Sequence, residues 1–169
     1  MFPNEAEAQL ETLYRKYARL VFQYAVRRGC PKADAEDVVI DTFVSCWRSL
    51  PKPPEQPLAW LFGAARGILA NRRRARGREH ALCERIAQAE ETAEMAERGE
   101  SPPTAKGMGL FIAISRLSER DREALLLVEW DGLSMAEAAM VLDTSSQAVR
   151  QRLSRTRRLL QQELAMLDG

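Results

Sequence analysis

Apolar residues recur at steps of three and four along most of this 169-residue chain, which is the spacing of amphipathic α-helices. The first such segment covers residues 10–24 and ends near Gly29, since glycine followed by Pro31 stops a helix. The second extends over about residues 33–50. Its buried face is predicted to carry Val39, Phe43, Cys46, Trp47 and Leu50. No segment shows the period of two that a half-buried strand requires, so the sequence predicts an all-α fold.

A proline-rich segment, residues 51–57, separates the second helix from a third. Proline has no N–H donor and restricts the residue before it, which predicts a stiff, extended loop. The third helix begins near residue 58. Its buried stripe is predicted to hold Leu58, Leu61, Phe62, Ala65, Ile68 and Leu69. Gly63 and Gly67 lie in the interior of this helix, where each glycine lowers helix stability by about 1 kcal/mol relative to alanine. One interpretation is that they allow another helix to pack closely.

Large apolar side chains become rare over residues 81–109, where glutamates precede Pro102 and Pro103. A segment of this composition buries too little apolar surface to order itself. The sequence therefore predicts two small helical domains, residues 5–80 and 110–169, joined by a flexible acidic linker over residues 81–109.

The second domain has the order of a helix-turn-helix. Ser118 is predicted to cap a helix that reaches Trp130, and Ser134 and Thr144 to begin two further helices as capping boxes. Between the helices that begin at Ser134 and Thr144, Asp143 marks a tight turn, since aspartate tolerates left-handed backbone better than most residues do. The last helix is predicted to bury Val149, Leu153, Thr156 and Leu160.

Arginine is concentrated in two stretches, although the net charge of the chain is only +1. Residues 66–78 contain six arginines and no acid, and residues 150–158 contain five arginines and no acid. Such clusters indicate two polyanion contacts. Arginine can bind guanine with two parallel hydrogen bonds, Gln147 can pair with adenine, and the remaining cations neutralise phosphates. The last helix is therefore expected to enter the major groove of duplex DNA.

The first ten residues carry two glutamates and no apolar run, so no secretory signal is expected. No segment is long and apolar enough to predict membrane insertion. Cys30, Cys46 and Cys83 form no close pair, which is typical of a reducing compartment. We therefore expect a cytoplasmic protein, with Cys46 as a small core residue.

Three segments in order resemble one protein family, the extracytoplasmic-function (ECF) group of bacterial sigma-70 factors. Residues 35–48, AEDVVIDTFVSCWR, resemble the segment of that group that binds core RNA polymerase. Residues 57–73 resemble its promoter-melting and minus-ten segment, and residues 117–160 resemble its fourth region, which binds the minus-35 element. The resemblance implies a non-catalytic subunit without a cofactor that binds polymerase, locates promoters through two elements and helps to open the duplex.

The resemblance also implies individual contacts. Those with the clamp helices of the largest polymerase subunit would be Asp37, Ile40, Asp41, Val44 and Arg48. Those with the minus-ten element would be Arg66, Asn71, Arg72, Arg73, Arg74 and Arg76. Those with the minus-35 element would be Ser145, Ser146, Gln147, Arg150, Gln151, Arg152, Arg155 and Arg158. The implied partners are the polymerase clamp and flap, duplex and single-stranded promoter DNA, and an anti-sigma factor.

Three other interpretations fit parts of the sequence less well. A helix-turn-helix regulator that acts without polymerase fits the second domain, but no ligand- or phosphate-receiving site is visible in the first. A metal or thiol sensor would combine His80 and Cys83 with Cys30 or Cys46, which falls short of four ligands at zinc-site spacing. An enzyme is the weakest, since the one histidine has no nucleophile or paired carboxylates around it.

Overall fold

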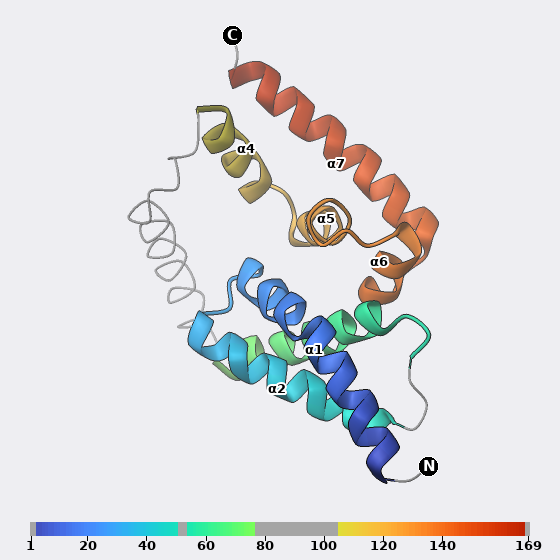
Figure 1. The fold of residues 1–169 in the computed structure, drawn as a ribbon. Helices are drawn as coiled ribbons and strands as arrows, with labels where there is room; N and C mark the ends of the chain where they lie inside the picture. Colours follow the sequence, from blue (N-terminus) through green and yellow to red (C-terminus); the bar gives the residue numbers. More distant parts are fainter. Residues whose placement is uncertain (1–2, 51–53, 77–104, 168–169) are drawn as a thin grey trace. The chain divides into compact units, whose positions relative to one another are not determined.

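The computed structural model describes residues 3–50, 54–76 and 105–167, and the regular elements within these ranges are all helices (Figure 1). The chain divides into two compact units, residues 1–95 and 96–169. This confirms the all-α prediction with two helical domains. Within the same ranges, no helix combines the length and the apolar character needed to span a bilayer.

The first unit contains α1 (Pro3–Arg27), α2 (Lys32–Ser49) and a helix over residues 57–76. Gly29 ends α1 in left-handed backbone at φ 81°. The N–H of Cys30 then reaches back to the carbonyl of Ala25 at 3.1 Å, and Pro31 leads directly into α2. The predicted stop near Gly29 is therefore confirmed.

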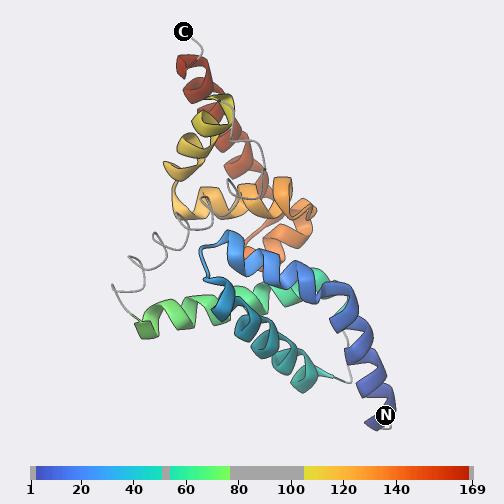
Figure 2. The same ribbon diagram turned by 60° about the vertical axis from the view of Figure 1, so that its left-hand side comes forward.

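Figure 2 shows the ribbons of these three helices, and aromatic contacts hold the helices together. The ring of Tyr24 on α1 stacks on Phe62 with centroids 4.5 Å apart, and Tyr14 meets the edge of Phe43 on α2 at 4.9 Å. Such pairs add to the stabilisation that comes from apolar burial. The same core buries Val21, Ala25, Ala35, Val38, Val39, Cys46, Ala59, Leu61, Ala65 and Leu69.

Gly63 and Gly67 do not serve close packing. A methyl group added at either position would meet no atom within 4 Å outside its own helix. Packing among the described residues therefore gives no reason for two glycines in the interior of this helix.

The second unit contains α4 (Ala105–Ser115), α5 (Glu119–Leu125), a π-helix η1 (Leu126–Trp130), α6 (Met135–Leu142) and α7 (Ser146–Leu167). Helix α4 begins before residue 110, the expected start, and residues 81–104 of the predicted linker lie outside the described ranges. The predicted helix up to Trp130 widens into π geometry over its last turn, which apolar periodicity does not reveal.

Two of the three predicted N-caps are confirmed. The Ser118 hydroxyl accepts the N–H of Asp121 at 3.2 Å, and Ser134 with Glu137 forms a reciprocal capping box. The predicted cap at Thr144 is wrong. Its N–H bonds to the carbonyl of Ala139 in the turn that closes α6, and the cap of α7 is Ser145, whose hydroxyl accepts the N–H of Ala148 at 3.1 Å.

We expect Ser145→Ala to lower the free energy of unfolding by about 1 kcal/mol, the usual cost of removing an N-cap. Thr144→Ala is the matched control and should cost much less, since its side chain caps nothing. Urea unfolding followed by circular dichroism measures both changes. Equal costs at the two positions would contradict the assignment of the cap.

Candidate nucleic-acid and protein interfaces

Helix α7 has one buried side and one exposed side. Val149, Leu153, Thr156 and Leu160 are buried against the other helices of the unit, as predicted. The opposite side exposes Gln147, Gln151, Ser154 and Arg158, with Arg150 at its edge. Ser154 was not among the predicted contacts, although the helical period places it with them. This exposed side is the candidate DNA-reading face.

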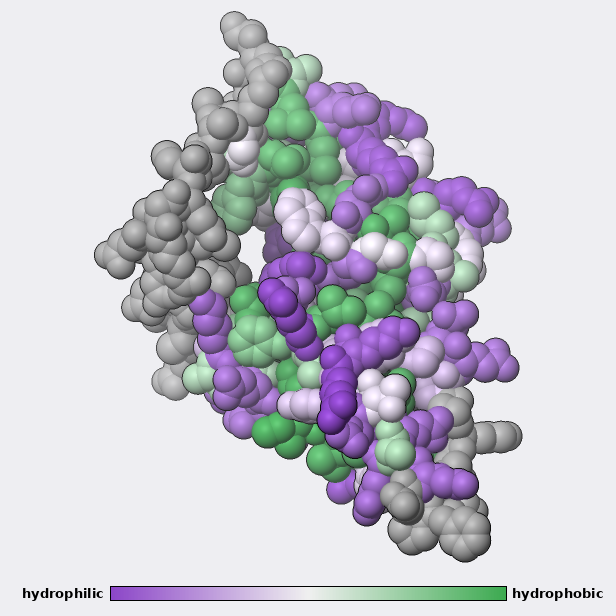
Figure 3. Space-filling model, in the orientation of Figure 1, coloured by the Kyte–Doolittle hydropathy of each residue, from purple (hydrophilic) through white to green (hydrophobic). Residues whose placement is uncertain are grey.

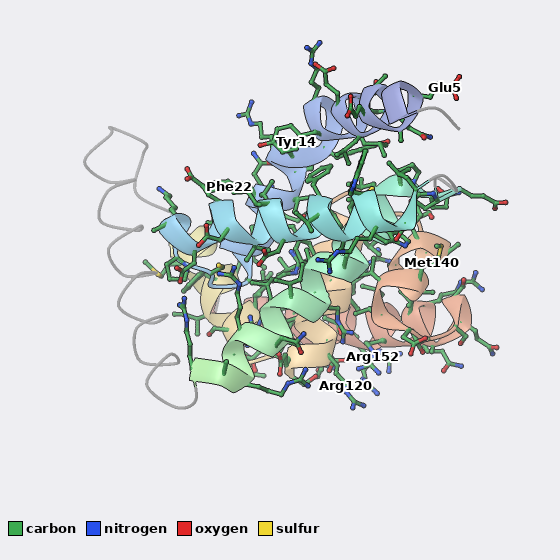
Figure 4. The ribbon with its side chains drawn as sticks, turned by 90° about the horizontal axis from the view of Figure 1, so that it is seen from below. Glu5, Tyr14, Phe22, Arg120, Met140 and Arg152 are labelled. Atoms are coloured by element: carbon green, nitrogen blue, oxygen red, sulfur yellow. The ribbon has the colours of Figure 1, made fainter. Side chains whose placement is uncertain are left out.

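Two arginines that were predicted to contact DNA bind a carboxylate of their own unit. Asp121 on α5 is only 8% exposed, and it accepts hydrogen bonds from Arg155 at 3.1 Å and Arg152 at 3.3 Å. The side chain of Arg152 is labelled in Figure 4. Arg157 is likewise paired with Glu129 on η1. Within the described part of the chain, Arg150 and Arg158 are the arginines of α7 without an ion pair.

The buried carboxyl of Asp121 predicts how the second unit responds to acid. Burial raises its pKa, but hydrogen bonds with Ser118 and Arg155 and the charges of Arg155 and Arg152 outweigh burial and hold the pKa below its ordinary value. A carboxyl with a lowered folded pKa stabilises fully above the unfolded pKa, about 3.9, and loses this contribution as the pH falls through the folded pKa.

Asp121→Asn should therefore be less stable than the wild type at pH 7, and the difference should shrink as the pH is lowered below about 4. Urea midpoints measured by circular dichroism between pH 3 and pH 7 would test this. A difference that stays constant over this range would contradict an ionised Asp121.

The basic end of the helix over residues 57–76 is bound to α2 and to the turn that follows α1. Arg72 donates to Asp41 at 2.8 Å, and Arg76 pairs with Asp34. Arg73 donates to the backbone carbonyl of Arg28 at 2.6 Å. The pKa of Arg76 is raised, first by its hydrogen bond with Asp34, then by the charge of Asp34 and more weakly by that of Asp37.

The other predicted minus-ten residues lie on the same helix. Arg66, Asn71 and Arg74 are exposed, and Arg74 donates to the side-chain carbonyl of Asn71. The structure therefore gathers all six residues on one helix, with part of their charge engaged by neighbours.

Helix α2 exposes an apolar stripe. Ile40 is 55% exposed, Val44 43% and Trp47 41%, and steps of four and three residues align them on one side. Asp37, Asp41 and Arg48 flank the stripe and are also exposed. The sequence had placed Trp47 on the buried face, and the structure corrects this. A contiguous exposed apolar surface with a polar margin is typical of a protein interface.

A second apolar surface lies on α4, where Met108, Phe111 and Ile112 are exposed (Figure 3). Phe111 is 65% exposed, the largest fraction among the aromatic side chains of the described residues. Helix α4 packs against α7, and the described residues of the unit leave these three side chains partly uncovered.

The residues of the sensor interpretation are not brought together in the described ranges. Cys30 and Cys46 are buried and form no disulfide, and burial raises the pKa of the Cys46 thiol. This confirms Cys46 as a core residue. His80 and Cys83 lie outside the described residues, and the described ones contain no group of three potential metal ligands.

Comparison with known families identifies both halves. Residues 13–79 match Sigma-70 region 2, and residues 113–160 match Sigma-70, region 4. The RNA polymerase sigma factor CnrH of Cupriavidus metallidurans is 33% identical over 166 residues, which cover 93% of this chain and 85% of CnrH. The ECF RNA polymerase sigma factor SigL of Mycobacterium tuberculosis is 28% identical over 168 residues, which cover 95% of this chain and 94% of SigL.

Solved structures agree with this assignment. CnrH in complex with the cytosolic domain of CnrY has a TM-score of 0.62, with 96% of this chain and 89% of CnrH covered. The sigma factor RpoE of Bartonella quintana, in complex with the anti-sigma factor NepR, has the same fold at a TM-score of 0.64 and 21% identity, with 93% of this chain and 97% of RpoE covered. The chain is therefore a member of the ECF group of the sigma-70 family, an alternative RNA polymerase sigma factor.

Proposed function

We propose that this sigma factor binds core RNA polymerase through the exposed stripe of α2 that comprises Ile40, Val44 and Trp47. The observation that supports this is the exposure of three large apolar side chains in a row, since water-facing apolar surface of this kind is stabilised when a partner covers it. Asp37, Asp41 and Arg48 border the stripe and would fix the orientation of the polymerase clamp helices by charge.

The DNA contacts divide between the two units. Cations at the basic end of the helix over residues 57–76 would bind the minus-ten element, with Arg66 and Arg74 exposed for phosphates. On α7, Gln147, Arg150 and Gln151 would read bases from the first turns of the helix, and Arg158 would contact a phosphate. Arg152 and Arg155 would act mainly by holding α7 against α5 through Asp121.

Transcription in vitro tests the function as a whole. Purified core polymerase is incubated with genomic DNA fragments with and without the chain, and RNA start sites are mapped. Defined starts that require the chain are expected. A chain that binds duplex DNA but yields no new starts and does not bind core polymerase would instead be a regulator that acts without polymerase.

An anti-sigma factor is proposed as a further partner. RpoE of B. quintana is in complex with one in its solved structure, and this chain exposes apolar side chains on both α2 and α4. An anti-sigma factor bound to these faces would keep the sigma factor from polymerase. Once the sigma factor is released, the polymerase flap would contact its second unit. Since polymerase works in the bacterial cytoplasm, the predicted location follows from the same proposal.

A further inference from the structure

Asp41 stands between two proposed interfaces. It borders the apolar stripe of α2, and its Oδ2 accepts a hydrogen bond from Arg72 at 2.8 Å. Arg72 belongs to the cations proposed for the minus-ten DNA, and its side chain is only 25% exposed in this pairing. Asp41 is therefore placed to pair either with a cation of the polymerase or with Arg72, which is proposed to bind DNA.

The pairing is repeated two turns away. Asp34 lies seven residues before Asp41 on α2 and pairs with Arg76, which follows Arg72 by one turn. Helical spacing puts Asp34, Asp37 and Asp41 along one side of α2, so a row of acids follows the basic end of the neighbouring helix. Arginines bound to carboxylates are less available to phosphates, because a phosphate has to displace the carboxylate first.

From this geometry we infer that Asp41 holds Arg72 back from DNA in the free chain and releases it when polymerase occupies the α2 face. The inference rests on the proposed role of α2 in polymerase binding. A polymerase cation that takes Asp41 would leave Arg72 without its partner and open to phosphate. Both binding events have to break the same Asp41–Arg72 pair, so removal of Arg72 should strengthen polymerase binding by about the factor by which removal of the Asp41 charge strengthens DNA binding.

The first test uses the full-length chain without polymerase. Its affinity for a fluorescein-labelled single strand of about twenty thymidines is measured at low ionic strength by anisotropy, where exposed charges are least screened. Asp41→Asn is expected to bind about two- to fivefold more tightly than wild type, the range for an exposed ion pair. Glu36→Gln is the matched control, because it removes the same charge from an exposed position of α2 without a pair to Arg72.

A double variant separates the pair from general charge. Asp41→Asn combined with Arg72→Ala should bind the thymidine strand no more tightly than Arg72→Ala alone. The inference is overturned if Glu36→Gln strengthens binding as much as Asp41→Asn, or if the gain persists without Arg72.

The second test measures polymerase binding in the absence of DNA. Arg72→Ala should bind core polymerase about two- to fivefold more tightly than wild type, because polymerase no longer has to break the pair with Asp41. Unchanged affinity would show that polymerase and Arg72 do not compete for Asp41, and would overturn the inference while the proposed function stands. A wild-type chain that binds no core polymerase would instead overturn the proposed function, whatever the result with thymidine.

Discussion

Replacement of Trp47 by alanine is expected to weaken the complex with core polymerase by about 30-fold or more. Tryptophan is prominent among the residues whose truncation costs about 2 kcal/mol or more at an interface. Here it lies 41% exposed at one end of the stripe with Ile40 and Val44, so that a partner can cover both its ring and its neighbours. Affinity is measured with labelled core polymerase, and the same variant should lose most transcription in vitro at limiting concentration.

Leu20→Ala is the matched control for this prediction. Leu20 is a large apolar residue of the same unit, 39% exposed, but it lies on α1 and outside the stripe. Because Trp47 is also partly buried, thermal unfolding must show that the variant is folded. Ile40→Lys provides a second variant, since Ile40 is the most exposed of the three and a lysine there can remain in water. Normal polymerase affinity in both variants would exclude this face.

Local features of the fold were predictable because they depend on neighbours in the sequence. Ser118 with Asp121 and Ser134 with Glu137 lie three residues apart, and a single turn of helix brings each pair together. The failure at Thr144 shows the limit of this reasoning. Thr144 and Ser145 offer similar hydroxyls, and the left-handed backbone of Asp143, at φ 51°, decides which of them reaches the start of α7.

The sites were less predictable because they depend on contacts across the fold. Trp47 fits a helical stripe on either side of α2, and only the packing of α1 and the helix over residues 57–76 decides that it faces water. Asp121 lies about thirty residues before Arg152 and Arg155, so no local pattern assigns these arginines to it. A count of arginines along α7 therefore overestimates how many are available for DNA.

This distinction predicts different effects for two neighbouring arginines. Arg150→Ala should weaken binding to a mapped promoter by roughly five- to 150-fold, the effect of losing a bidentate base contact worth about 1–3 kcal/mol. Its stability should be unchanged, since the side chain is exposed and makes no ion pair among the described residues. Binding of the polymerase holoenzyme is measured on that promoter and on a fragment with an altered minus-35 element. The variant should bind the promoter more weakly than wild type does, and the two should bind the altered fragment about equally, because that fragment lacks the base that Arg150 contacts.

Arg152→Ala should show the opposite pattern. It removes one of the two guanidinium groups that neutralise the buried carboxylate of Asp121, and a buried charge with fewer partners destabilises the fold. Its urea midpoint should therefore fall, while discrimination between the two promoter fragments is retained. The Arg152→Ala and Asp121→Asn double variant should lose less stability than the sum of the two single variants, because both act on one ion pair. If Arg152→Ala instead abolishes discrimination at unchanged stability, Arg152 reads a base, and its pairing with Asp121 does not persist when α7 lies in the groove.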